Sequence, residues 1–212
     1  MRPAKLVAAL AAGLVVQACA AMSYIAPRYT EERAALSETT VLDRQDFENS
    51  CGLAALSTAF SAWGEPFDER AVYAETRPGS EAGYTLAELT EIVQARGGRL
   101  YSFRPDYADF VTHTGRRRPM ILPVYKPTPR GMTALLSPIH RDMLVHAWWR
   151  EDVTGEPNHY LVVLHADEDR VYLFDPAMGD FAVSREAFER QRALWSPVAA
   201  LPVPGSALPS ES

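Results

Sequence analysis

Four side chains that could carry out acyl chemistry occur along the chain in the order Gln45, Cys51, His159 and Asp175. A cysteine thiolate can attack an acyl carbon, and a histidine can accept and then return the proton that this reaction moves. An acid can orient the histidine, and a glutamine amide can stabilise the oxyanion that forms. This order of residue types predicts a thiol active site with Cys51 as the nucleophile.

The residues around Cys51 predict a helix that begins just before it. Asn49 or Ser50 can cap this helix, its apolar residues recur at helical spacing, and Gly64 ends it. Cys51 then lies in the first turn, where backbone amides favour a negative charge. Gln45 is six positions upstream, a gap that lets its amide turn toward the cysteine. With the backbone N–H of Cys51 it would form an oxyanion hole.

The apolar runs at 159–165 and 171–175 predict a β-hairpin that carries the histidine and the acid. Side chains alternate between the two faces of a strand, so the loop length decides whether His159 and Asp175 share a face. The polar turn falls around residues 167–170. An odd loop would put the two residues on one face, and a three-residue loop over 166–168 would set them directly opposite each other. An even loop without a bulge would place them on opposite faces.

Each of these residues also has a purely structural interpretation. A single cysteine is often buried for packing alone, Gln45 could be a solvated loop residue, and His159 could cap a strand. Asp175 before Pro176 is also a common signal for the end of a strand. Histidine alone discriminates nothing, since the chain also has His113, His140, His146 and His165. We expect His165 on the same strand face as His159, which makes it the closest competitor.

The N-terminus has the pattern of an export signal. Positive charges at Arg2 and Lys5 precede a short apolar stretch at 6–16, too short for a comfortable membrane span. The run Val16-Gln17-Ala18-Cys19 resembles a bacterial lipoprotein cleavage box, which would make Cys19 the lipidated first residue of the mature protein. The alternative is an ordinary signal peptide cleaved near residues 20–21, and both export the chain.

The composition of the chain bears on disulfide bonds, nucleic-acid binding, metals and cofactors. The chain has two cysteines, so assigning Cys19 to export leaves Cys51 without a disulfide partner. The formal net charge is -6, and the only basic cluster is Arg116-Arg117-Arg118, so we expect no nucleic-acid partner. The sequence has no zinc-binding cluster and no Walker motif, and we therefore expect neither a metal nor a cofactor.

The remaining patterns predict one α+β domain. We expect a signal peptide over 1–18, a tether over 19–40, the domain over 41–200 and a disordered tail over 201–212. Within the domain the sequence predicts further elements: a helix after a capping box at Thr85–Glu88, strands at 100–104 and 120–125, a short helix at 106–112, a loop at 126–138, a helix at 141–149, a strand at 181–183 and a last helix capped by Ser184.

These residues resemble the papain-like double-glycine leader peptidases that process bacteriocin-type precursors. The matches are Gln45, Cys51-Gly52 with Ala54-Ala55-Leu56, His159-Tyr160-Leu161-Val162-Val163, Asp175-Pro176 with Gly179, and Gly83, Thr85 and Leu89. The resemblance implies a papain-like fold with N-terminal helices packed on a C-terminal antiparallel sheet. It also implies cleavage of a peptide bond, commonly after two glycines, by Cys51, His159 and Asp175, with Gln45 in the oxyanion hole.

Three features depart from this family. Asn49-Ser50 precede the cysteine where an acidic residue is more usual, and the stretch 126–158 is longer than the family needs. Many relatives are cytosolic domains of ABC exporters, whereas this chain carries an export signal. The resulting hypothesis is a lipid-anchored thiol endopeptidase on the periplasmic side of a bacterial membrane, acting on a peptide or secreted protein precursor. The alternatives are an acyltransferase that uses the same thiol and a non-catalytic peptide-binding chaperone of a secretion system.

Overall fold

The computed structural model describes residues 38, 40–65, 67–124, 159–193 and 196–208. The chain divides into two compact units, 1–38 and 39–212, and every described helix and strand belongs to the second. The predicted signal peptide, the loop at 126–138 and the helix at 141–149 lie outside the described residues. The predicted domain boundaries at 18 and 40 stay predictions.

A six-stranded sheet forms the centre of this second unit, with the strands in the order β1-β6-β2-β3-β4-β5. Every neighbouring pair is antiparallel. The strands are β1 (Arg99–Phe103), β2 (Met120–Val124), β3 (His159–Ala166), β4 (Arg170–Asp175), β5 (Gly179–Ser184) and β6 (Ala199–Val203). The hairpin expected around His159 and Asp175 is therefore β3–β4.

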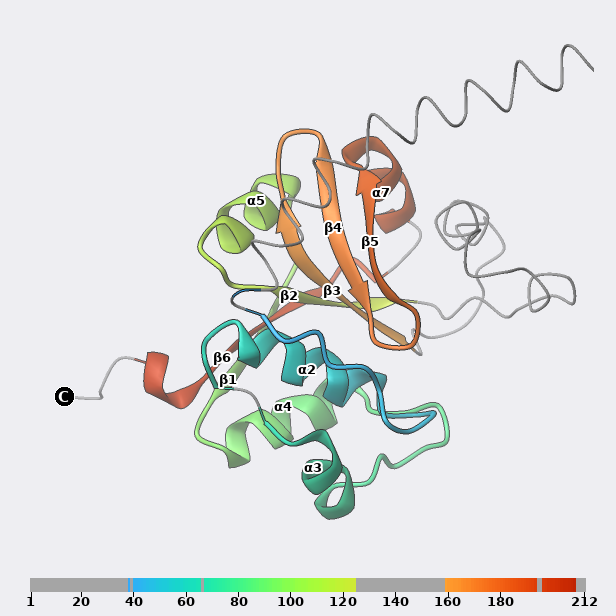
Figure 1. Ribbon diagram of the computed structural model, residues 1–212, viewed down its shortest axis with the longest axis vertical. Helices are drawn as coiled ribbons and strands as arrows, with labels where there is room; N and C mark the ends of the chain where they lie inside the picture. The colour runs from blue at the N-terminus through green and yellow to red at the C-terminus, as the bar shows by residue number, and fades with distance from the viewer. Residues whose placement is uncertain (1–37, 39, 66, 125–158, 194–195, 209–212) are drawn as a thin grey trace, which may run out of the picture. The chain divides into compact units, whose positions relative to one another are not determined.

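Helices cover both faces of the sheet (Figure 1). On one side lie α2 (Cys51–Ser61), α3 (Glu69–Glu75) and α4 (Leu86–Ala95), and on the other lie α5 (Tyr107–Gly115) and α7 (Arg185–Arg192). A short 3₁₀ helix spans Gly205–Ala207. Phe110 of α5 and Phe188 of α7 are fully buried in the core that the sheet forms with these two helices. The predicted α+β class, with N-terminal helices packed on an antiparallel sheet, is confirmed.

The start of α4 follows the predicted capping box. The Thr85 hydroxyl accepts a hydrogen bond from the Glu88 amide, and the Glu88 carboxylate accepts one from the Thr85 amide. The sequence patterns did not predict α3, although its start has a recognisable signal. Asp68 accepts hydrogen bonds from the amides of Arg70 and Ala71, as an N-cap does.

The predicted disordered tail at 201–212 is wrong for its first residues. Leu201, Pro202 and Val203 belong to β6, which pairs along its whole length with β1. The prolines at 202 and 204 suggested a tail because proline cannot donate to a strand ladder. The β6 ladder with β2 is limited to Ala200 and Ile121, so Pro202 lies beyond it. Burial of Ala199, Ala200 and Leu201 outweighs the local preference.

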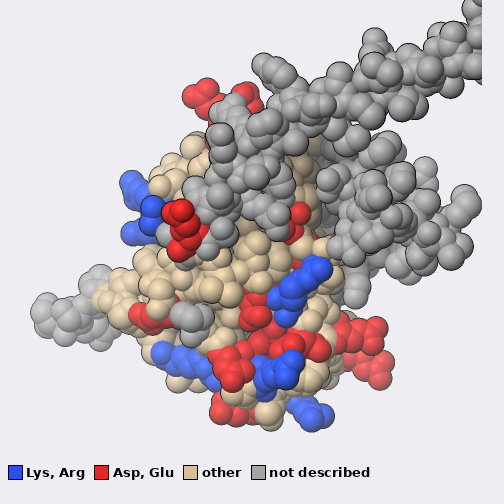
Figure 2. Space-filling view, viewed as in Figure 1, with Lys and Arg blue, Asp and Glu red and all other residues tan. Residues whose placement is uncertain are grey.

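Three kinds of functional feature can be looked for among the described residues: a basic surface for nucleic acid, a membrane-spanning helix and a metal site. Lys and Arg side chains are scattered among Asp and Glu side chains on the face shown in Figure 2 and form no continuous basic surface there. Of the helices in the described ranges, none has the length and apolarity to cross a bilayer. Within the same ranges, no group of three or more His, Cys, Asp or Glu side chains could hold a metal ion.

Candidate active site

Cys51 is the first residue of α2 and is only 4% exposed. Ser50 occupies the N-cap position, but its side chain makes no capping hydrogen bond. The predicted side-chain cap is therefore wrong: the Ser50 hydroxyl bonds to Phe47, and the Asn49 side chain accepts a hydrogen bond from Tyr73. The Ser50 carbonyl accepts hydrogen bonds from the Leu53 and Ala54 amides, so the amides of Cys51 and Gly52 are the first-turn donors left to favour a negative charge at Cys51.

Buried packing holds α2 in place, and all eleven of its residues are buried. The chain that precedes the helix is attached to its far end, because Ser61 and Thr58 accept hydrogen bonds from the amides of Val41 and Asp43. Next to Cys51, a Cβ on Gly52 would lie 3.2 Å from the Tyr160 ring. The start of α2 thus packs tightly against the strand that begins with the histidine.

His159 and Asp175 form a buried pair at the ends of β3 and β4. The distance between His159 Nε2 and Asp175 Oδ1 is 2.9 Å, and their side chains are 3% and 10% exposed. The same Oδ1 atom accepts hydrogen bonds from the amides of Ala177 and Met178, so the turn after β4 fixes the carboxylate. Because Asp175 takes Nε2, the other ring nitrogen of His159 is the one left for the thiol.

The loop between β3 and β4 lies where the polar turn was expected and has an even number of residues. Ala166 pairs with Val171, so four residues, Asp167–Arg170, separate the two ladders. Of the two alternatives, the even loop is the one that forms, and the three-residue loop over 166–168, which would have set His159 directly opposite Asp175, does not. The Asp167 side chain stabilises the longer loop, since it accepts hydrogen bonds from the amides of Asp169 and Arg170.

A β-bulge restores the shared face that this even loop would remove. The register shifts between the Val163–Leu173 pair and the His165–Tyr172 pair, which leaves Leu164 as the extra residue of β3. On the side of the bulge where β3 begins and β4 ends, odd-numbered residues of both strands point to the same face. His159 and Asp175 are therefore diagonal neighbours on one face, close enough to form a hydrogen bond.

The bulge also separates His159 from the competing histidine. His165 lies on the other side of Leu164 and pairs with Tyr172, whose ring is 5.8 Å from the His165 ring. The expectation that His165 shares a strand face with His159 is therefore wrong. His113 lies in the last turn of α5 beside Phe103, while residues 140 and 146 lie outside the described ranges.

The surroundings of His159 favour its charged form. Burial disfavours the imidazolium most strongly, but hydrogen bonds with Asp175 and Cys51, together with the charges of both, outweigh burial and raise the pKa of His159 to about 9. The ordinary value is 6.5. The stability that the pair contributes is thus fully present below about pH 6.5 and is lost as the pH rises through about 9.

Gln45 is brought to the Asp175–Pro176 turn by its main chain. Its backbone N–H donates to the Pro176 carbonyl at 3.1 Å. Its side-chain Nε2 donates to the carbonyl oxygens of Phe47 at 2.9 Å and Glu48 at 3.1 Å. In this structure the amide therefore supports the loop that leads to Cys51, and the oxyanion role stays a prediction.

The sequence patterns missed one further polar residue at this loop. Glu69 is 3% exposed, and its carboxylate accepts a hydrogen bond from the Asp46 amide at 3.0 Å. In the sequence it looks like an ordinary acidic residue in a helical first turn, after the Asp68 cap. Only the fold reveals that α3 packs against the segment between Gln45 and Cys51.

Comparisons with known proteins concern one stretch of the sequence and the fold. A family model described as "Peptidase C39 family" matches residues 131–206, a range that contains His159 and Asp175 but not Cys51. No curated protein matches the chain in sequence. The peptidase domain of Streptococcus ComA, a bifunctional ABC transporter involved in quorum sensing, is similar in structure with a TM-score of 0.54 and 17% identity over 78% of this chain and 98% of that one.

A second solved structure has a similar fold. It is a double glycine motif protease from an AMS/PCAT transporter in complex with the leader peptide, with a TM-score of 0.51 and 15% identity over 78% of this chain and 91% of that one. At these identities the structural likeness concerns the fold, and the family model adds support for a cysteine peptidase. The chain therefore resembles the Peptidase C39 family in sequence over residues 131–206 and has a fold similar to that of double-glycine peptidase domains.

Proposed function

We propose that the chain is an exported cysteine endopeptidase in which Cys51 is the nucleophile, His159 the acid and base, and Asp175 the group that orients the histidine. The observation that carries this proposal is the buried His159–Asp175 hydrogen bond of 2.9 Å at the ends of β3 and β4, with Cys51 at the start of α2 close enough to raise the pKa of His159. These are the three groups that thiol hydrolysis needs, arranged so that each acts on the next.

The reaction follows from this geometry. The Cys51 thiolate attacks the carbonyl carbon of the scissile peptide bond, and the carbonyl oxygen becomes an oxyanion. The intermediate collapses as the C–N bond breaks, and the His159 imidazolium gives its proton to the leaving amine. Water then attacks the acyl-enzyme while His159 takes one of its protons, the C–S bond breaks, and the thiolate and imidazolium return.

Two donors are assigned to the oxyanion. One is the backbone N–H of Cys51, at the uncapped start of α2. The other is the amide of Gln45, which must exchange its hydrogen bonds to the Phe47 and Glu48 carbonyls for one to the oxyanion. Loss of one such donor costs about a hundredfold or more in rate.

The substrate and the location complete the proposal. The protease from the AMS/PCAT transporter was solved with a leader peptide, which supports a peptide substrate cleaved after two glycines. We place the enzyme in the bacterial cell envelope, attached by a lipid on Cys19, because the sequence of residues 1–19 has the pattern of a lipoprotein signal. Its substrate would then be a secreted or surface-assembled precursor.

Alkylation with iodoacetamide tests the pairing of Cys51 with His159. We expect wild-type Cys51 to react rapidly at pH 7, and His159→Ala to slow the reaction about tenfold or more, because the imidazolium that favours the thiolate is gone. Mass spectrometry locates the adduct and stopped time points give the rate. In the wild type, peptide hydrolysis should fall as the pH rises through about 9, where His159 loses its proton, while alkylation continues.

His165→Ala is the matched control for this experiment, since it removes a histidine from the same strand but from the other face. It should alkylate at the wild-type rate. Equal rates for wild type and His159→Ala would rule out an activated thiolate at Cys51.

The lipid anchor has its own test. Cys19→Ser should release the protein from the membrane into the soluble fraction, because serine cannot take the thioether-linked lipid. Cell fractionation together with incorporation of radiolabelled palmitate measures both effects, and Cys51→Ala should stay labelled and membrane-bound. A Cys19→Ser protein that remains in the membrane without label would show that the lipoprotein signal was misread.

A further inference from the structure

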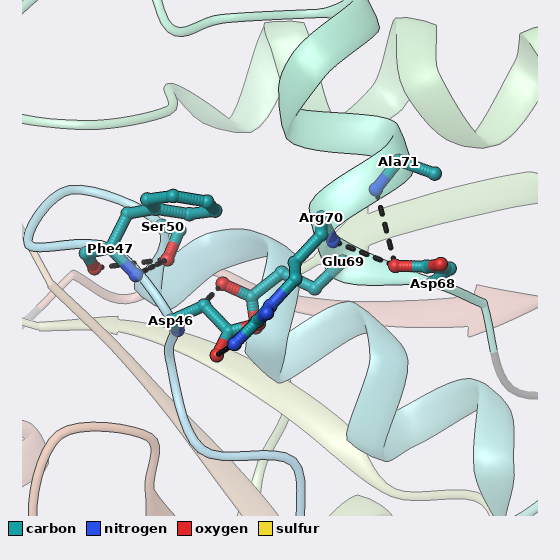
Figure 3. A network of polar contacts seen from close by, with 7 residues as sticks. All are labelled: Asp46, Phe47, Ser50, Asp68, Glu69, Arg70 and Ala71. Atoms are coloured by element: carbon teal, nitrogen blue, oxygen red, sulfur yellow. Dashed lines mark hydrogen bonds and ion pairs between the residues drawn. The ribbon is translucent and has the colours of Figure 1, made fainter.

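The main chain on both sides of Gln45 is held by hydrogen bonds from different parts of the fold. On one side, the N–H of Gln45 donates to Pro176, directly after the acid of the proposed site. On the other side, the next N–H, that of Asp46, donates to Glu69 Oε1 at 3.0 Å. The peptide that follows Gln45 is therefore fixed by a carboxylate from α3, as Figure 3 shows.

Glu69 is placed unusually for an acidic residue. It is 3% exposed, and its second oxygen, Oε2, is buried without a hydrogen-bond partner among the described residues. Burial raises the pKa of its carboxyl, while the Ser50 hydroxyl and the Asp46 amide favour the charged form, and the charges of Asp43 and Asp46 oppose it. Burying a carboxyl in this way costs desolvation free energy, and the hydrogen bonds that the carboxyl makes must offset that cost.

Its contacts reach both ends of the loop that carries the proposed chemistry. One oxygen binds the amide that follows Gln45, and the Ser50 hydroxyl, close to the same carboxyl, belongs to the residue that precedes Cys51. Ser50 also closes this loop, because its hydroxyl bonds to both the amide and the carbonyl of Phe47. Glu69 thus lies close to both ends of this loop, and its hydrogen bond to the main chain is at the Asp46 end.

We propose that Glu69 is a positioning residue that holds the peptide after Gln45, so that the Gln45 amide can reach the oxyanion formed at Cys51. This inference rests on the proposed peptidase function. It assigns Glu69 no contact with substrate, and its effect on catalysis passes through Gln45 alone.

The neighbouring residue Arg70 provides a matched control. Arg70 also binds Asp46, through two hydrogen bonds of 2.6 and 2.9 Å to its carboxylate. This ion pair is on the surface, with the Arg70 side chain 73% exposed, and such pairs contribute little. Arg70 and Glu69 both belong to α3 and both bind Asp46. Arg70 does so at the surface and Glu69 in the interior.

The experiment is a double-mutant cycle in the full chain, with a fluorogenic peptide that has two glycines before the scissile bond. Glu69→Ala should lower kcat about tenfold to a hundredfold, in the range expected for a weakened oxyanion donor. Cys51 alkylation should stay within about twofold of wild type, because the Cys51–His159 contact is not touched. In a Gln45→Ala background, Glu69→Ala should lower kcat no further.

Two variants separate positioning from folding. Glu69→Gln should restore most of the activity, because its amide oxygen can still accept the Asp46 N–H, and Arg70→Gln should keep kcat within about threefold of wild type. Normal kcat in Glu69→Ala, or additive losses in the double variant, would overturn the inference.

Hydrogen exchange at the Asp46 amide distinguishes this inference from the proposed function. The amide should be protected in wild type and Glu69→Gln and should exchange faster in Glu69→Ala, whether or not the peptide is cleaved. Fast exchange in wild type overturns the positioning role. A wild type whose Cys51 is not alkylated would overturn the peptidase function instead, with the protection of Asp46 unchanged.

Discussion

Cys51→Ala is expected to abolish peptide cleavage, with a loss on the order of 10⁶-fold in kcat, as when the nucleophile of a catalytic triad is removed. The variant has no atom that can form the acyl-enzyme, so only transition-state binding remains. The fold should persist, because alanine keeps the helical start of α2 and removes only one buried sulfur atom. Cleavage of a fluorogenic peptide measures the loss, and thermal unfolding checks the fold.

Cys19→Ala is the control for the nucleophile, because it removes the only other cysteine of the chain. We expect it to cleave the peptide at the wild-type rate when both proteins are compared in detergent. If Cys51→Ala cleaved normally, or if Cys19→Ala alone lost activity, the nucleophile would be misassigned.

Asp175→Asn is expected to lower kcat, and with it kcat/KM, by about 10⁴-fold without unfolding the domain, the size of effect known for the aspartate of a serine-protease triad. The amide oxygen can still accept hydrogen bonds from the Ala177 and Met178 amides, which keeps the turn after β4. The negative charge that stabilises the His159 imidazolium is lost, so the pKa of His159 should fall from about 9.

Measurement of kcat/KM across pH, with an NMR titration of the His159 ring, tests this expectation. Glu186→Gln is the control, because it removes one carboxylate from the exposed ion pair with Arg190. It should change neither quantity. An Asp175→Asn enzyme with normal kcat/KM, or with an unchanged pKa of His159, would show that Asp175 serves only the turn.

Local sequence signals predicted the elements that carry Cys51 and His159. The helix α2 was recognisable from its apolar spacing and from Gly64 beyond its end, and the start of α4 from the Thr85 capping box. These signals worked because capping and periodicity act within a few residues of the chain. They also sufficed to predict the β3–β4 hairpin and to pose the question of whether its two polar ends share a face.

The features that sequence patterns missed depend on contacts between distant segments. β6 contains Pro202 and looks like a tail, yet it is a strand because β1, far earlier in the chain, pairs with it. Glu69 has an ordinary local pattern, and its role appears only where α3 meets the loop after Gln45. The bulge at Leu164 is equally hidden, because no residue type marks where a ladder shifts.

The bulge has a consequence for how such enzymes can vary. Loss of the extra residue at Leu164 would leave a regular ladder through the Val163–Leu173 pair, and a longer or shorter Asp167–Arg170 loop would leave that ladder in register, so both changes keep His159 and Asp175 on one face. One residue inserted or deleted in the strand segments 159–163 or 173–175 would instead turn one member of the pair to the other face. In related chains we therefore expect length changes in this hairpin at the loop and at the bulge, and none between the bulge and the two polar ends.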